Sequence, residues 1–178
     1  FPDMDGDGLG DASIAAIVQC EEPIILTEAD IDFEDFPDGT HVVDQYSALG
    51  IYFAGSAYGI VGGLAEGDPG NWDLEGTAGS HFLGFNGGSY QDTLSFDAPI
   101  TSFSLDVSRS NGSSSGDEFE MRAYLDESLV DSVSITLPAI NSWVTVSIED
   151  TWFDTVEIQG FGGGFHPYGV DRLVFDGA

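Results

Sequence analysis

The sequence predicts an all-β protein built as an antiparallel β-sandwich. Apolar and polar residues alternate in several segments, most clearly in 101–108, which places Phe103, Leu105 and Val107 on one face. Turn signals rich in Gly, Pro, Asp and Asn separate these segments, as at 37–39, 67–70 and 86–88. No segment has the pattern of a long helix. Many short strands divided by frequent turns are typical of a sandwich.

The elements divide the chain into an N-terminal extension, residues 1–27, and a sandwich, residues 28–178. Within the extension, residues 12–27 are ambiguous, because Ile14, Ile17 and Val18 fit a short helical face whereas Ile24–Leu26 fits a strand. In the sandwich we expect strands at 30–36, 41–46, 51–56, 81–86, 91–96, 101–108, 118–125, 130–137, 143–148, 154–159 and 170–176.

The extension opens on an acidic, glycine-rich segment. Its carboxylates belong to Asp3, Asp5, Asp7 and Asp11, with glycines between them. Calcium takes six to eight oxygen ligands, and alternating carboxylates around a glycine turn supply them. Without a cation, carboxylates this close would repel one another, so the spacing predicts a Ca²⁺ loop. The alternative is a solvated acidic tail.

The same segment departs from the EF-hand pattern, because its twelfth position is Ile14 rather than Glu. Residues 3–12 resemble a thrombospondin type 3 repeat, although that family usually continues with Cys and Asp where this chain has Ser13 and Ile14. The resemblance implies calcium binding and an extracellular setting for about a dozen residues.

The charge balance narrows the classes of partner. The chain has 32 Asp plus Glu against three Lys plus Arg, for a formal net charge of −29. Phosphate binding requires clustered cations, so nucleic acid and anionic membranes are excluded as partners, and no apolar run has membrane-spanning length. Cations, neutral sugars and other proteins fit. Calcium outside the cell or high salt would offset the self-repulsion, and the clustering of the acids favours calcium.

Residues 28–38 contain six acids, and the alternation there places Glu28, Asp30, Asp32 and Glu34 on one face of an expected strand. Residues 33–36, with residues 168–175, resemble the first and last strands of bacterial jelly-roll modules, a group that includes carbohydrate-binding modules and MAM-like adhesion domains. The resemblance implies a jelly-roll sandwich with a structural Ca²⁺ held by Glu34, or Asp35, together with Asp171. The alternative is that Asp171 is a turn residue.

Aromatic residues in loops suggest a glycan platform, because sugar C–H faces stack on rings. The candidates are Trp72, Trp152, Phe165, His166 and Tyr168. The alternative is that these side chains fold over the edge of the core. An enzyme is not expected: His41, His81 and His166 are scattered, and no nucleophile elbow, P-loop or dinucleotide fingerprint is present.

The sequence therefore predicts a secreted, non-enzymatic, calcium-stabilised β-sandwich with a structural or adhesive role. Residues 1–27 would connect it to copies of itself, or to another extracellular protein, in a fibre or surface layer, with Ile24–Leu26 adding a strand to an open sheet edge. The alternative is a glycan-binding module of a larger secreted protein that degrades or adheres to polysaccharide.

Overall fold

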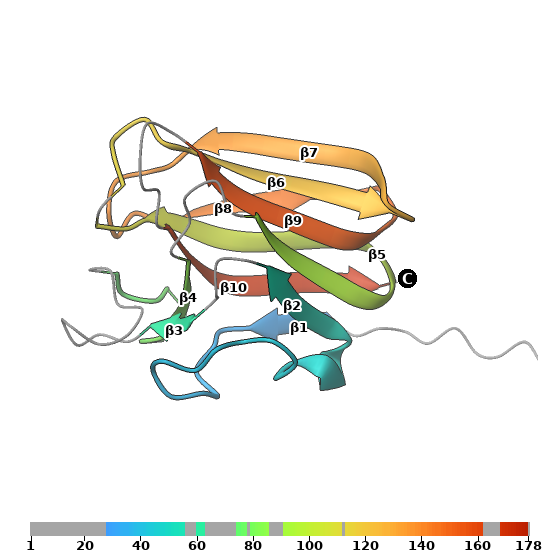
Figure 1. The fold of residues 1–178 in the computed structure, drawn as a ribbon, viewed down its shortest axis with the longest axis horizontal. Helices are drawn as coiled ribbons and strands as arrows, with labels where there is room; N and C mark the ends of the chain where they lie inside the picture. The colour runs from blue at the N-terminus through green and yellow to red at the C-terminus, as the bar shows by residue number, and fades with distance from the viewer. Residues whose placement is uncertain are drawn as a thin grey trace, which may run out of the picture.

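A computed structural model describes residues 28–55, 60–62, 74–77, 79–85, 91–111, 113–161 and 168–177. In this part of the chain the predicted antiparallel β-sandwich is confirmed (Figure 1). The extension of residues 1–27, with its four calcium-loop aspartates and the segment Ile24–Leu26, lies outside the described residues. No helix of the described part has the length and apolarity needed to cross a membrane.

The strands form two layers that share one long strand. The first layer consists of β2 (Ile51–Gly55), the first half of β5 (Gln91–Arg109), β9 (Phe153–Phe161), β6 (Glu118–Leu125) and β7 (Ser128–Thr136). The second consists of β8 (Val144–Ile148), the second half of β5, β10 (Tyr168–Gly177), β4 (Phe82–Phe85) and β3 (Ile60–Gly62), with β1 (Ala29–Ile31) paired to the far end of β10.

Strand β5 passes from one layer to the other. Residues 92–96 pair with β2 and residues 91–95 pair with β9, whereas residues 103–107 pair with β8 and the same part of the strand also pairs with β10. The register with β9 shifts between Ser95 and Ile100, around Pro99, which has no backbone N–H to donate. The sequence predicted two strands here, 91–96 and 101–108. The chain instead bends and continues, as strands do at the corners of sandwiches.

The core lies between the layers and follows the predicted alternation. Leu94, Met121 and Ile158 enter it from the first layer, and Leu105 and Val170 enter it from the second. A smaller apolar cluster covers the outer face of β10, where a Cβ on Gly169 would lie 2.5 Å from Leu74 Cδ1 and 3.0 Å from Phe82 Cδ2. Glycine at this position therefore lets residues 74–77 pack closely against the sheet.

Two expected strands differ from the structure: one is shorter than predicted, and a turn takes the place of the other. The strand expected at 30–36 ends at Ile31, because Phe33 is buried with a φ of 61° and Asp32 Oδ1 accepts a hydrogen bond from the Glu34 backbone N–H at 3.1 Å. This turn separates the acids that strict alternation placed on one face. The segment 41–46 is a turn that leads into the 3₁₀ helix η1 (Ser47–Leu49); its Tyr46 reaches the core without a strand.

Candidate functional site

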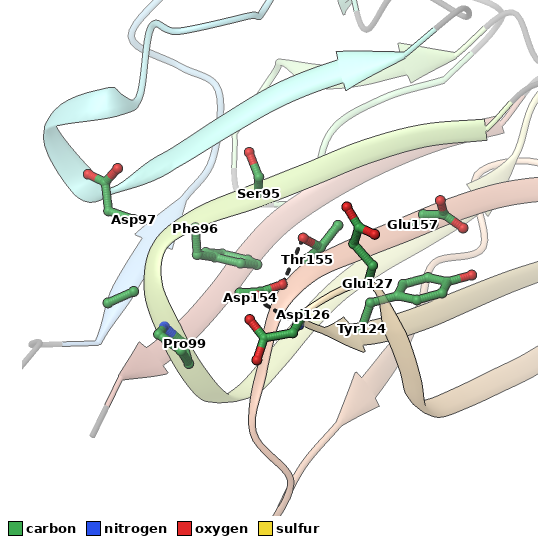
Figure 2. A pocket seen from close by; sticks show the side chains of 11 residues that line it. Ser95, Phe96, Asp97, Pro99, Tyr124, Asp126, Glu127, Asp154, Thr155 and Glu157 are labelled. Carbon is green, nitrogen blue, oxygen red and sulfur yellow. Dashed lines mark hydrogen bonds between the residues drawn. The ribbon is translucent and has the colours of Figure 1, made fainter.

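A cleft of about 680 Å³ opens on the outer face of the first layer, where β5, β9 and β6 run side by side. The bend of β5 closes one side of the cleft and the β6–β7 hairpin closes another (Figure 2). Its lining residues are Ser95, Phe96, Asp97, Ala98, Pro99, Tyr124, Asp126, Glu127, Asp154, Thr155 and Glu157.

Three lining residues, Ser95, Thr155 and Tyr124, belong to a row of directly opposed residues that crosses five strands and extends beyond the cleft at both ends. In order, the row contains Tyr52, Ser95, Thr155, Tyr124 and Leu129. Opposed residues of antiparallel strands point to the same face, so all five lie on the outer side. Ser95 and Thr155 are small and form a hydroxyl-bearing floor. Tyr52 and Tyr124 flank this floor, three strand spacings or about 14 Å apart.

Each tyrosine has a carboxylate partner. Tyr52 Oη donates to Asp97 Oδ2 at 3.5 Å, and the charge of Asp97 raises the Tyr52 pKa. Partial burial, followed by the hydrogen bond and charge of Glu157, raises the Tyr124 pKa, while Arg122 opposes this shift. Two tyrosine–carboxylate pairs therefore stand on opposite sides of the floor. A tyrosine donor uses one of the four lone-pair sites of a carboxylate and leaves the others for a ligand.

The hairpin contributes two further carboxylates. Asp126 and Glu127 form the turn between β6 and β7 with φ of 48° and 64°, as two-residue hairpin turns of type I′ require. The Asp126 backbone N–H donates to Asp154 Oδ2 at 3.1 Å, and Asp154 Oδ1 accepts from Thr155 Oγ1 at 3.0 Å. These bonds fix Asp154 at the mouth of the cleft.

The electrostatics of the cleft select against anions. Five of its lining residues are acidic and none is cationic. The nearest arginine in the strand register, Arg122, forms an ion pair with Glu120 one step along the same face of β6. Neutral or cationic ligands are therefore compatible with this cleft, and polyanions are not.

The carboxylates predicted to bind calcium lie on the other layer. Glu34 follows β1 and binds the segment before β4. Glu34 Oε1 accepts from the backbone N–H groups of Ser80 and His81, both at 2.5 Å, and Oε2 lies 2.9 Å from His81 Nδ1. The other ring nitrogen of His81 lies 2.8 Å from Asp38 Oδ1. Partial burial opposes the charged forms, but these bonds outweigh it, lowering the Glu34 pKa and raising the His81 pKa.

Asp171 is fully buried in the middle of β10 and binds the same segment from the other side. Its Oδ2 accepts from Thr77 N at 2.5 Å and from Thr77 Oγ1 at 2.9 Å, and Oδ1 accepts from Arg172 N at 2.8 Å. Asp171 thus binds Thr77, and Glu34 binds Ser80 and His81, which lie close to Thr77 in the sequence. The carboxylate oxygens of Glu34 and Asp171 accept N–H and O–H bonds in this arrangement, so a cation would have to displace those donors.

Asp35 is exposed in the turn after β1. Burial raises the pKa of Tyr46, and the charge of Asp35 adds to this shift. The described residues contain no group of three or more His, Cys, Asp or Glu arranged to hold a metal ion. Calcium stays a prediction for both locations, and the N-terminal loop lies outside the described residues.

The predicted glycan platform is not assembled among the described residues. Trp152 precedes β9, is 49% exposed and is not among the residues that line the cleft. Tyr168 is fully buried, with its ring 5.3 Å from that of Phe119, so it packs in the core. Trp72, Phe165 and His166 lie outside the described residues.

The cleft residues were not predicted from the sequence, although the alternation of polar and apolar residues indicates an outward direction for some of them. Tyr124 and Glu157 stand at the positions of the predicted strands 118–125 and 154–159 that alternate with the core-facing residues. Alternation alone places them on an outer face. It does not give the strand order, and the strand order brings both residues beside Ser95.

Two solved structures share this fold. One is the K1 cleaved adhesin domain of Lys-gingipain from Porphyromonas gingivalis W83, with a TM-score of 0.56 and 11% identity over 85% of this chain and 99% of that chain. The other is the K2 cleaved adhesin domain of Lys-gingipain, with a TM-score of 0.57 and 10% identity over 84% of this chain and 99% of that chain. A mutant of a carbohydrate binding module family 29 reaches a TM-score of 0.48 at 13% identity, covering 84% of this chain and 91% of that chain, which is too low to argue a shared fold. No protein-family model and no curated protein sequence matches the chain. At these identities the likeness shows the sandwich fold alone.

Proposed function

We propose that this chain is an extracellular, non-catalytic adhesive module whose cleft binds the hydroxyl groups of an uncharged or amino-bearing glycan. One observation carries the proposal: in an open, acidic cleft, Ser95 and Thr155 lie between the Tyr124–Glu157 pair and Asp97, which accepts a hydrogen bond from Tyr52 beside the cleft. The K1 and K2 domains are adhesin domains of Lys-gingipain, which supports the adhesive part of the proposal.

The chemistry of the cleft suits a sugar. Carboxylates accept hydrogen bonds from sugar hydroxyls, and charge-assisted bonds of this kind are about twice as strong as neutral ones. Tyrosine rings offer an apolar face together with a polar tip, which matches the alternation of C–H and O–H groups on a pyranose. A largely preformed site on strands needs little ordering when the ligand binds.

Retention on immobilised polysaccharides tests this function. We expect Tyr124→Ala to weaken retention about tenfold or more on any neutral or aminated glycan that the native protein binds, because the ring and the positioned Glu157 are both lost. Trp152→Ala is the matched control, since Trp152 is an exposed aromatic that does not line the cleft. Loss of retention in Trp152→Ala but not in Tyr124→Ala would move the glycan site to the predicted loop platform.

A structural role as a calcium-dependent, self-assembling subunit is the second candidate. The resemblance to jelly-roll modules supports an ion near Glu34 and Asp171, and the Asp-rich start of the chain supports another. Under this proposal residues 1–27 connect neighbouring subunits. Deleting residues 1–20 then dissolves assemblies while the sandwich stays folded, which light scattering and circular dichroism measure together.

A further inference from the structure

The first layer ends at β7, and within the described part of the chain β7 pairs with β6 alone. Figure 1 shows β7 as the outermost strand, with β6 beside it. Seven of its nine residues are exposed, and the other two, Val133 and Ile135, are half-buried against the core. An edge of this length presents a row of backbone groups that can pair with another strand.

Natural edge strands are usually blunted by Lys, Pro, charges or bulges. Strand β7 contains no Lys or Pro, and its one charged residue is Asp131. The register with β6 shifts at Val130, near the start of the strand, so residues 132–136 are regular. This half of the edge therefore carries none of the usual protection.

The second layer has its own edge on the same side. Strand β8 pairs with β5 and lies next to β7. Four of the seven exposed large apolar residues of the described chain belong to this side of the sandwich: Leu129, Val130, Ile140 and Val144. The two edges and these four exposed side chains are together called the apolar rim.

Charge identifies the partner that this rim suits. Residues 132–148, which cover most of β7 and all of β8, contain no charged side chain, in a chain with 32 acids. Two copies that approach by other faces bring acids against acids. A cationic partner would gain more electrostatic binding energy at the acidic faces than at this neutral rim. A second copy of the chain is therefore the partner for which a neutral, self-complementary edge is an advantage.

We infer that β7 pairs antiparallel with β7 of a second copy around a two-fold axis. This pairing joins the first layers of the two copies into one continuous sheet. With the axis at Ser134, each Asp131 lies opposite Leu137 of the other copy, so the pairing brings no two acids face to face. The contact leaves the row from Tyr52 to Tyr124 open, so the dimer presents two clefts.

A charge exchange at Ser134 tests this pairing. Ser134 is exposed, so Ser134→Asp and Ser134→Lys leave the core unchanged. Sedimentation velocity of the full chain is expected to give twice the 18.9 kDa monomer mass, with association strengthening as salt screens the net charge. Each variant alone is expected to be monomeric, because like charges meet across the axis. An equimolar mixture of the two variants is expected to recover the dimer.

Ser115→Asp and Ser115→Lys are the matched controls, because Ser115 is an exposed serine in the turn before β6. They are expected to dimerise like the native chain, and thermal unfolding confirms the fold of every variant. A native chain that stays monomeric at high protein and salt concentrations overturns the inference. So does a Ser134→Asp variant that dimerises like the native chain. Loss of association on deleting residues 1–27, with no effect of the Ser134 variants, assigns the contact to the extension instead.

Discussion

Asp92 is one of three buried aspartates among the described residues, together with Asp117 and Asp171, and it lies on the core side of its strand. Asp92 shares the core-facing side of β5 with Leu94 and Phe96, is 6% exposed, and its Oδ2 accepts no hydrogen bond from the described residues. Burial raises its pKa to about 8, and its charge, after burial itself, contributes to the raised pKa of Tyr168. At neutral pH the folded protein therefore holds Asp92 mainly in its neutral form.

The raised pKa makes stability depend on pH. Between the unfolded pKa of 3.8 and the folded pKa of about 8, the folded state binds more protons than the unfolded state, so the free energy of unfolding falls as pH rises. Asp92→Asn is expected to remove this slope, so its gain in stability over the native chain grows from about pH 4 and levels off above about pH 8, at roughly 6 kcal/mol at most. Urea unfolding of the native chain and of Asp92→Asn at several pH values measures the two slopes.

Glu149→Gln is the control for the Asp92 experiment, because Glu149 is exposed and loses the same charge. Its stability should keep the pH slope of the native chain. A native slope that persists in Asp92→Asn would show that the self-repulsion of the surface acids, and not the buried carboxylate, sets the pH dependence.

At the scale of elements, alternation located most strands, and their ends depended on the local backbone. Residues 118–125 were predicted with the observed bounds of β6. The strand expected at 30–36 stops early because Phe33 adopts a left-handed conformation, which is uncommon for a bulky residue. The segment 97–99 has the composition of a turn, yet β5 continues through it, because pairing on both sides holds the bent strand.

The β6–β7 hairpin carries a conformational cost that a substitution can remove. Glu127 has a φ of 64°, a region that glycine adopts without steric penalty. Glu127→Gly is expected to raise the free energy of unfolding by about 0.5–1 kcal/mol, even after the added flexibility of the unfolded chain is counted. The shift in the urea midpoint measures this gain. Glu127→Gln, which removes the charge and keeps the backbone cost, should leave the midpoint close to that of the native chain.

If Glu127→Gly is no more stable than Glu127→Gln, the left-handed turn stores no strain. Glu127 also lines the cleft, so the proposed glycan function predicts that both substitutions weaken retention. Stability rising while retention falls is the pattern expected where a binding residue occupies an unfavourable backbone conformation.

Over the whole molecule, strand order decided how much of the site could be predicted. The net charge of −29 leads to the expectation that polyanions are not partners, and the cleft lining, with five acids and no cation, has the same sign of charge. The cleft itself could not be predicted, because Ser95, Tyr124 and Thr155 are far apart in the sequence and lie side by side only through the pairing of β5, β9 and β6. Alternation alone does not relate Glu34 to Asp171; only the resemblance to known modules suggested that the two residues act together.

Calcium is expected to stabilise the folded chain, because its positive charge offsets the net negative charge of the whole molecule. An ion that binds the folded state alone raises stability by RT ln(1 + [L]/Kd), which is about 2.7 kcal/mol at a hundredfold excess over Kd. We expect Ca²⁺ to raise the Tm well above the value in NaCl of equal ionic strength, and chelator to reverse the gain. Equal Tm values in the two salts would mean that the acids need only screening.

Paired variants then locate the ion. Glu34→Gln should reduce the calcium-dependent gain if the ion lies beside residues 77–81, whereas Glu118→Gln, an exposed acid on β6, should not. Asp3→Asn with Asp5→Asn tests the N-terminal loop in the same way. A gain that survives Glu34→Gln but not the Asp3 and Asp5 substitutions assigns calcium to the extension. In that case the N–H bonds of Glu34 suffice to hold residues 77–81 without a metal.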